Sequence, residues 1–256
     1  MERLILMSGI FLLLFIFERI IPQVNRNIVG KNHDISNIAL GIINLIIGRS
    51  FALFIVYTLA KYVENLNFGF MNMTHFDSKV KFILGVIFLD CLNYWWHRMV
   101  HKISFLMRFH SIHHTDRLLN VSSALRFHFL EVILGHLFKL PFIFLIGIPI
   151  EALLLYDVIF NMNVYFHHSN IRINRSLDIF LSKVIVTPYI HRIHHSLKLK
   201  ESNSNFSSFL ILWDKIFGTF FPQGKASTPK YGIPGYTDEK YQYFIYMMKQ
   251  PFIGKK

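Results

Sequence analysis

Histidine stands out in this chain both by number and by spacing. The sequence contains 14 histidines, and most of them lie between His97 and His195. Three clusters have the spacing of one helical face: His97/His101, His110/His113/His114 and His191/His194/His195. Residues three or four apart are neighbours on a helix, and two imidazoles so placed can bind one metal ion. The clusters therefore predict a metal centre carried by helices.

The number of histidines indicates two metal ions. A single ion cannot use so many ligands, whereas two ions with about four or five each can, and paired ions are a known catalytic arrangement. Imidazole suits zinc, copper, iron and nickel, so the ligands alone leave the metal open. The predicted ligands are the three clusters, His128 and one of an adjacent pair: His97, His101, His110, His113, His114, His128, His168, His191, His194 and His195.

Two acids lie inside apolar sequence. Asp90 precedes His97 by seven residues and Asp157 precedes His168 by eleven, so each acid shares a helical face with its histidine. Ionisable residues in apolar segments are costly and mark functional sites. We expect each carboxylate to orient a metal-bound histidine. The alternative is that each pairs with an arginine or closes a polar pocket.

The composition favours an integral membrane protein. Hydrophobic residues make up 53% of the chain, charged residues 16%, and the mean hydropathy is +0.39. A soluble domain has about 25% charged residues, and so apolar a chain is neither disordered nor a coiled coil. The net charge of +12 suits an anionic membrane surface better than nucleic acid. The single cysteine, Cys91, excludes an intramolecular disulfide and a cysteine-rich zinc motif.

Apolar runs predict the helices that position the histidines. They cover about residues 4–17, 35–60, 80–96 and 129–168, with a shorter run at 206–221. The longest can hold two helices joined by a turn at Gly147-Ile148-Pro149. Arg49 interrupts the second run, and the cost of a charge in the bilayer predicts that it faces other helices or that the centre of the span is shifted along the run. We expect an all-α membrane protein with about four or five transmembrane helices.

The distribution of charge predicts the topology. Residues 97–128 and 169–201 are strongly basic, whereas 61–79 is nearly balanced. Cytoplasmic loops carry an excess of lysine and arginine, so the histidine-rich segments should form a helical cap on the cytoplasmic side. The predicted division is N-terminal membrane helices (1–79), a catalytic domain (80–221) and a cytoplasmic tail (222–256).

The combined pattern resembles the fatty acid hydroxylase superfamily, also called the sterol desaturase family. The similar segments keep the family's order and spacing between about residues 80 and 221. They are Asp90-Cys-Leu-Asn-Tyr-Trp-Trp-His97-Arg-Met-Val-His101, His110-Ser-Ile-His113-His114-Thr, Arg126-Phe-His128-Phe-Leu-Glu131, His168-Ser-Asn170, Thr187-Pro-Tyr-Ile-His191-Arg-Ile-His194-His195 and Leu212-Trp213-Asp214-Lys-Ile-Phe217-Gly218-Thr219-Phe220.

The resemblance implies an integral membrane enzyme in which the clustered histidines and His168 hold two irons. His128 lies in an Arg-x-His element that some bacterial members share, although Phe129 replaces the proline that often follows it. Some lipid hydroxylases have a further ligand at the position of Asn163. The resemblance therefore leaves open whether His167 or Asn163 also contributes.

The family's reaction is oxidation of an unactivated C–H bond of a lipid by O2. The resemblance thus implies two iron ions as cofactor, O2 as co-substrate, and a sterol, fatty acyl or alkylglycerol lipid as substrate. Hydroxylation and desaturation use the same ligands, and the sequence favours neither. We expect a separate cytochrome, ferredoxin or reductase as electron donor. The alternatives are a catalytically inactive metal-binding membrane protein and a metal carrier, whose ligands would line a path between spans.

Overall fold

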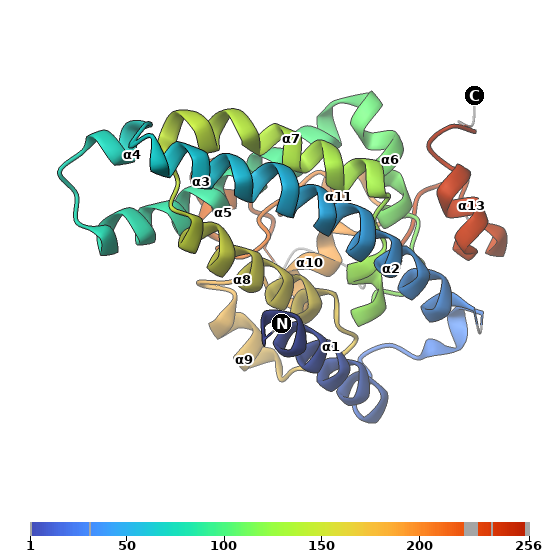
Figure 1. Ribbon diagram of the computed structural model, residues 1–256. Coiled ribbons are helices and arrows are strands. Elements are labelled where there is room, and N and C mark those ends of the chain that lie inside the picture. The colour runs from blue at the N-terminus through green and yellow to red at the C-terminus, as the bar shows by residue number, and fades with distance from the viewer. Residues whose placement is uncertain (1, 31, 223–229, 237, 254–256) are drawn as a thin grey trace.

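A computed structural model of the chain describes residues 2–30, 32–222, 230–236 and 238–253. The described residues form helices and connections, as the apolar runs predict (Figure 1). No strand forms in this part of the chain, and extended pairing is limited to isolated bridges such as the one between Ile185 and Leu210. The predicted tail 222–256 is described only in part, because residues 223–229, 237 and 254–256 lie outside the described residues.

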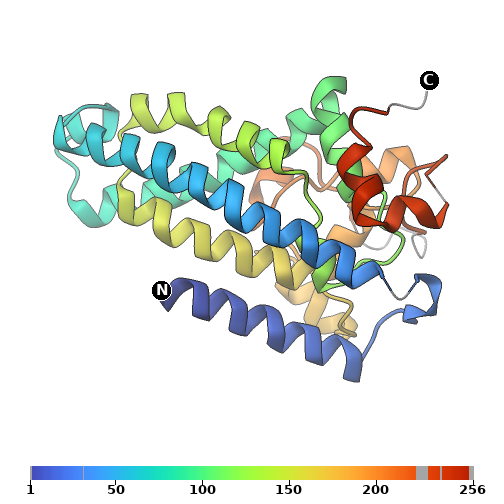
Figure 2. The ribbon, with the colours of Figure 1, turned by 45° about the vertical axis from the view of Figure 1, so that its right-hand side comes forward.

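Five long helices run side by side and make up the body of the molecule (Figures 1 and 2). They are α1 (Glu2–Ile20), α2 (His33–Phe51), α5 (Ser78–Lys102), α7 (Phe129–Ile146) and α8 (Ile150–His168). Helix α2 continues without a break through a π-helical segment, η2 (Ala52–Tyr57), into α3 (Thr58–Asn65). Every predicted apolar run up to residue 168 is therefore helical, with ends that differ by a few residues.

Short helices close the two ends of this body. Helix α4 lies at one end, and α6 and α13 lie toward the other (Figures 1 and 2). The short segments are η1 (Arg26–Ile28), α4 (Phe70–Met73), α6 (Ser104–His114), η3 (Val121–Leu125), α9 (Arg175–Leu181), α10 (Pro188–His194), α11 (Leu199–Ser202), α12 (Leu212–Ile216), η5 (Glu239–Gln242) and α13 (Phe244–Lys249).

The predicted turn between α7 and α8 is confirmed at Gly147. This residue ends α7 with a φ of 71°, a left-handed conformation that glycine adopts without steric cost. A Cβ atom here would lie 2.7 Å from the carbonyl oxygen of Phe68. Only glycine thus allows the turn to pack so closely against the connection between α3 and α4.

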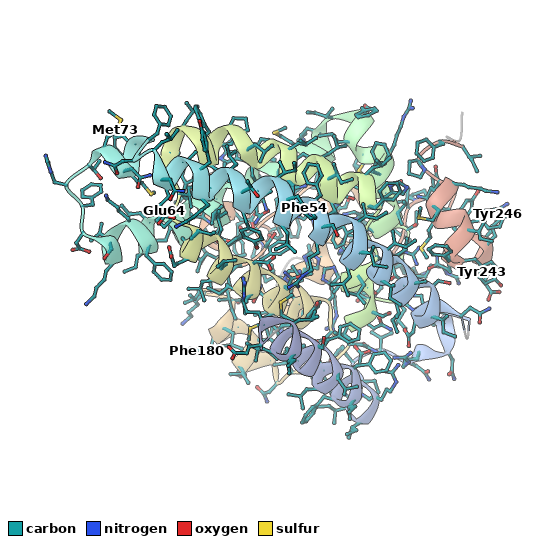
Figure 3. The ribbon with its side chains drawn as sticks, viewed as in Figure 1. Phe54, Glu64, Met73, Phe180, Tyr243 and Tyr246 are labelled. Carbon is teal, nitrogen blue, oxygen red and sulfur yellow. The ribbon has the colours of Figure 1, made fainter. Side chains whose placement is uncertain are left out.

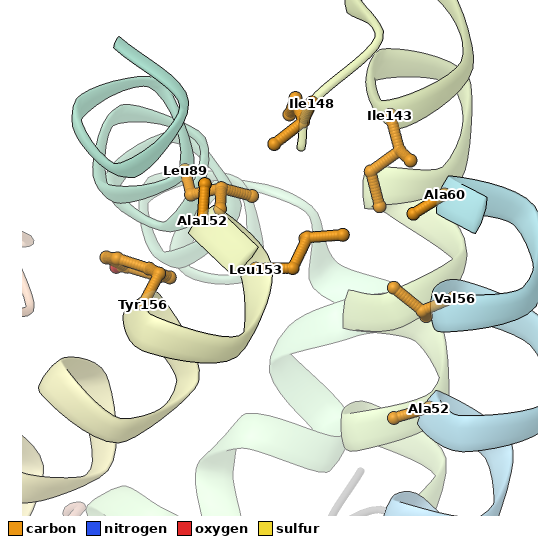
Figure 4. Close-up of a cluster of buried hydrophobic side chains, with 9 residues drawn as sticks. All are labelled: Ala52, Val56, Ala60, Leu89, Ile143, Ile148, Ala152, Leu153 and Tyr156. Atoms are coloured by element: carbon orange, nitrogen blue, oxygen red, sulfur yellow. The ribbon is translucent and has the colours of Figure 1, made fainter. Parts of the chain in front are cut away.

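An apolar core joins the long helices at the end of the molecule near this turn. Val56, Leu89, Ile143 and Tyr156 are buried there, and they come from η2, α5, α7 and α8 (Figure 4). Alanines interleave with these larger side chains, as at Ala152, and allow neighbouring backbones to approach. This core fixes the spacing of the helices that carry the histidines farther along.

The outer surface of the helical body is also apolar. Phe54 and Met73 are 76% and 74% exposed and project outward (Figure 3). Among the described residues, two stretches have the length and composition to cross a membrane: His33–Met73, with a mean hydropathy of 2.1 over an 18-residue window, and Phe129–Ile146, with 2.0. These two stretches are fewer than the four or five spans that the apolar runs predict.

The N-terminal helices and the described part of the tail pack onto the middle of the chain. Helix α1 contacts α8, and α2 contacts α7. From the tail, Met247 of α13 is buried against Leu40 of α2 and Ile112 of α6. The three predicted segments therefore share one packed structure around the histidine-rich elements.

Candidate metal centre

Three helices bring together a first group of five histidines. His97 and His101 lie one turn apart on α5, His110 and His114 lie one turn apart on α6, and His194 ends α10. The candidate ligand atoms of these five side chains all lie within 4.8 Å of one another. The spacing in sequence therefore places them as predicted, on facing sides of neighbouring helices.

A second group contains four buried histidines: His113, His168, His191 and His195. The Nε2 atoms of His113 and His168 are 3.0 Å apart, as are those of His168 and His191 and those of His191 and His195. Helix α6 and the end of α10 contribute to this group as well as to the first. The two groups adjoin where the rings of His114 and His195 stack, with centroids 4.4 Å apart.

The first group has the properties of a metal site. The Nδ1 atoms of His97 and His194 donate to the carbonyl oxygens of Phe206 and Ser204, each at 2.7 Å. Their Nε2 atoms therefore carry a free lone pair. Among the described residues, the Nε2 atoms of all members except His97 are buried and lack a hydrogen-bond partner. Buried polar atoms without partners are rare, and a metal ion would satisfy them together.

The second group fits a metal for a different reason. The Nδ1 atom of His168 donates to the carbonyl oxygen of Val164 at 2.8 Å, so its Nε2 carries no proton. Nitrogen ligands about 2.1 Å from one ion and at right angles to each other lie about 3.0 Å apart, the separation observed between neighbouring members. Neutral imidazoles suit iron, zinc and copper alike, so the donor set agrees with iron without selecting it.

Burial keeps these imidazoles neutral and ready to bind metal. Desolvation lowers the pKa of His113, His114 and His195 well below the usual value and that of His194 to about 3. Neighbouring histidines lower it further, because each disfavours a positive charge on the next. The lone pairs are therefore available at neutral pH without loss of a proton.

The metal-free protein should consequently lose stability in acid. These histidines stay neutral when folded but bind protons below a pKa of about 6.5 when unfolded. Acid therefore stabilises the unfolded state, and stability falls as the pH drops through this value. Between pH 7.5 and 5.5 each such histidine should cost about 1.4 kcal/mol. Thermal unfolding of metal-free and iron-loaded protein at both pH values tests this; equal midpoints for the metal-free protein would contradict it.

Three other histidines between His97 and His195 lie outside both groups: His128, His136 and His167. The Nδ1 atom of His128 accepts a hydrogen bond from the backbone N–H of Leu130 at 3.2 Å, and the ring stacks on Phe129. His128 thus caps the start of α7 and lies apart from the nine grouped histidines. His167 accepts from the side chain of Asn163 at 3.2 Å, and neither residue belongs to a group.

The two predicted carboxylates do not contact a histidine of either group. Asp90 accepts hydrogen bonds from the Tyr156 hydroxyl, the Leu210 backbone N–H and the Trp213 indole, at 2.9, 3.0 and 2.7 Å. These donors, rather than an imidazole, occupy its carboxylate. Asp157 lies in the wall of a cavity and accepts from Asn161 at 3.3 Å. For Asp90 the contacts agree with the alternative role of closing a polar pocket.

The carboxylate that does bind a grouped histidine is Glu131. In the first turn of α7, its Oε1 atom accepts from the Nδ1 of His110 at 2.7 Å. The sequence analysis included Glu131 in a family-like segment but assigned it no role. The signal that the sequence offers for Glu131 is its position three residues after His128, in the first turn of a helix.

Replacing Glu131 by glutamine should weaken iron binding at the first group about tenfold, because the partners that orient metal ligands typically contribute that much. Glutamine keeps the size of the side chain but loses the charge that favours the Nδ1–H form of His110. Competition with a chelator measures the affinity. Glu64→Gln is a matched control, since Glu64 is exposed and pairs only with Lys61. Equal affinities for both variants would refute the role of Glu131.

The carbonyl groups that accept from His97 and His194 belong to a partly buried loop at residues 203–221, which includes the short helix α12. Asp214 holds this loop: its carboxylate accepts from the backbone N–H groups of Phe206 and Ser207 at 2.8 and 2.9 Å, and from Thr219 at 2.7 Å. Phe206 is fully buried. The loop thus presents main-chain carbonyl groups to His97 and His194.

A cavity of about 500 Å³ reaches from the grouped histidines to the long helices. Five of these histidines line it: His97, His110, His113, His168 and His191. Apolar side chains of α1, α2, α7 and α8 line much of the remainder, among them Phe11, Leu45, Val132 and Phe160. A long apolar molecule in this cavity would meet the histidines at one end.

Comparisons with known proteins agree with the resemblance seen in the sequence. An ornithine lipid hydroxylase of Rhizobium tropici is 32% identical over 178 residues, which are 68% of this chain and 50% of that protein. An alkylglycerol monooxygenase of Homo sapiens is 30% identical over 60% of this chain and 33% of its own length. A lathosterol oxidase of Homo sapiens is 26% identical over 57% of the chain and 46% of its own length.

The matches to these relatives cover half or less of the relatives' own lengths. None of the solved protein structures matches the chain significantly. The family model for fatty acid hydroxylase matches residues 82–219, which is more than half of the chain and includes all nine grouped histidines. The chain therefore belongs to the fatty acid hydroxylase family.

Proposed function

We propose that this protein is a membrane-bound di-iron oxygenase that uses O2 and external electrons to oxidise an unactivated C–H position of a lipid. The observation that carries the proposal is the apolar cavity whose inner end is lined by five of the grouped histidines. The relatives support it, since they are by name a hydroxylase of ornithine lipid, a monooxygenase of alkylglycerol and an oxidase of lathosterol.

The two histidine groups would hold one iron each. When bound, the iron pair supplies the reductive activation of O2 that oxidation of such a C–H bond requires. Hydroxylation consumes one O2, two electrons and two protons, and yields the alcohol and one water. Desaturation consumes the same reagents and yields the alkene and two waters. A separate electron donor supplies the electrons in both cases.

The side chains of the protein would bind the lipid and orient the histidine rings. The apolar walls of the cavity hold the lipid chain and exclude water from the reacting end. Glu131 and the carbonyl oxygens of Phe206 and Ser204 fix the rings of three ligands, so the donor atoms are in place before metal binds. These hydrogen bonds hold the rings in one orientation, and burial keeps them neutral.

The same proposal includes a multi-pass membrane topology. The long helices span the bilayer, and the histidine-bearing elements form a cap on the cytoplasmic side. Support comes from the exposed apolar side chains of α1, α2 and α7 and from the basic segments 97–128 and 169–201. In a variant without Cys91, single cysteines at Lys61 and Lys198 should react with impermeant reagents from opposite sides. Labelling of both from one side would refute this topology.

Metal analysis and lipid analysis together test the enzymatic proposal. Detergent-purified protein should contain about two irons per chain, and cells that make it should contain a hydroxylated or unsaturated lipid only when O2 is present. Stoichiometric iron with an unchanged lipid profile in air would favour an inactive metal-binding protein. Folded protein without stoichiometric metal, whether prepared aerobically or anaerobically, would refute the metal centre itself.

A further inference from the structure

The part of the cavity away from the histidines is charged. Arg3 of α1, Arg49 of α2, Lys139 of α7 and Asp157 of α8 all line it. Arg49 thus faces a cavity that other helices also line, which is one of the two positions that the sequence predicts. Each of these four helices contributes one of the four charged side chains, and the surrounding sequence is largely apolar. Charged side chains within apolar membrane segments are costly and commonly mark substrate sites.

These charges do not balance. Asp157 interacts electrostatically with all three cations, but one carboxylate leaves a formal excess of two positive charges. Asn161 donates a hydrogen bond to Asp157, but its amide is neutral and adds no negative charge. An anion inside the cavity would offset the excess, and arginine is suited to hold a carboxylate or phosphate through two parallel hydrogen bonds.

The charged wall lies well away from the metal centre. Lys139 follows Glu131, the partner of His110, by eight residues on α7, which is about 12 Å along the helix axis. Asp157 precedes His168 by eleven residues on α8, or about 16 Å. Apolar side chains line the cavity over the interval, among them Val132, Phe160 and Val164. The cavity therefore has a charged end, an apolar middle and a histidine end.

We propose that the cavity selects a lipid with an anionic group, a carboxylate or a phosphate, that Arg49 and Lys139 bind while its apolar chain extends to the histidines. The inference rests on the proposed function, because it takes this cavity as the substrate site. It adds that oxidation occurs well along the chain rather than beside the headgroup, because about 12–16 Å of helix separates the charged residues from the residues at the histidine end. A neutral lipid would leave the net positive charge of this wall without an anion to offset it.

Binding of three probes of equal chain length tests the proposal without turnover. Iron-loaded protein is kept anaerobic in detergent and titrated with radiolabelled octadecanoic acid, octadecyl phosphate and octadecanol. We expect at least one anionic probe to bind about tenfold more tightly than the alcohol, which corresponds to about 1.4 kcal/mol. The tighter of the two anionic probes identifies carboxylate or phosphate as the recognised group.

Substitutions of opposite charge distinguish recognition from a structural effect. Lys139→Met and Arg49→Met should each weaken binding of the anionic probe about tenfold and leave binding of the alcohol within about twofold. Asp157→Asn should strengthen binding of the anionic probe. Lys79→Met is the control, because Lys79 is exposed at the start of α5 and does not line the cavity.

The outcomes separate this inference from the proposed function. Equal affinity for acid, phosphate and alcohol would overturn the inference and leave a lipid site in place. Weaker anion binding in both Lys139→Met and Asp157→Asn would also overturn it, since loss of structure affects both alike. If none of the three probes binds the folded, iron-loaded protein, the cavity is not the substrate site and the proposed function fails with the inference.

Discussion

Replacing His114 or His195 by alanine should abolish lipid oxidation, and each change should remove iron from a different group. The two rings stack at 4.4 Å, yet His114 belongs to the group of five and His195 to the group of four. Each substitution leaves one group short of a ligand. Because loss of a mere partner of a ligand lowers activity about 10- to 100-fold, loss of a ligand should exceed the upper value. Iron content and lipid product are the two measurements.

His75→Ala is the matched control for these variants. His75 is exposed on the connection before α5 and belongs to neither group. It should keep the iron content and the activity of the unchanged protein. If His114→Ala or His195→Ala likewise kept both irons, the grouping of ligands derived from the structure would be wrong.

Replacing Asp90 by alanine should destabilise the protein by about 3 kcal/mol or more. Its carboxylate is 1% exposed and accepts from Tyr156, Leu210 and Trp213. Alanine would leave these three donors buried without a partner, at about 1–3 kcal/mol each. The loop 203–221 would lose the hydrogen bonds through which Asp90 holds it to α5 and α8, so iron affinity should also fall. Thermal and chemical unfolding measure the effect.

Asp77→Ala offers a comparison on the same helix. Asp77 caps the start of α5, where its carboxylate accepts from the backbone N–H of Val80 at 2.9 Å. Loss of such a cap costs about 1 kcal/mol, far less than the loss expected at Asp90. If the two variants unfolded alike, with iron affinity unchanged, Asp90 would not fasten the loop.

The sequence was sufficient to single out the nine histidines that the structure groups, but not to divide them between two groups. Spacings of three and four residues place His97 with His101 and His110 with His114 because the helix itself sets those positions. Which group His113 joins depends on how α6 packs against α8 and α10, and this is a tertiary contact. Main-chain partners such as the carbonyl of Phe206 leave no side-chain signal to recognise.

For two predicted site residues, His128 and Asp157, the structure shows contacts that the sequence did not predict. His128 precedes an apolar run and is followed three residues later by Glu131, the pattern of a helix start, so local capping accounts for it without metal. Asp157 shares a helical face with His168, as the spacing of eleven residues predicts. Side chains on a shared face point in the same direction but need not lie close together, and about 16 Å of helix separates these two residues.

Alternation of the ligands along α6 and α10 links the two groups thermodynamically. His110 and His114 belong to one group and His113, between them, to the other; on the second helix, His194 lies between His191 and His195 in the same way. In the proposed di-iron centre, an ion bound in either group would contact both helices that carry ligands of its neighbour. Any motion of these helices that the first ion restricts would no longer oppose binding of the second, which gives a positive coupling free energy between the sites. Iron would then load cooperatively, with little half-filled protein.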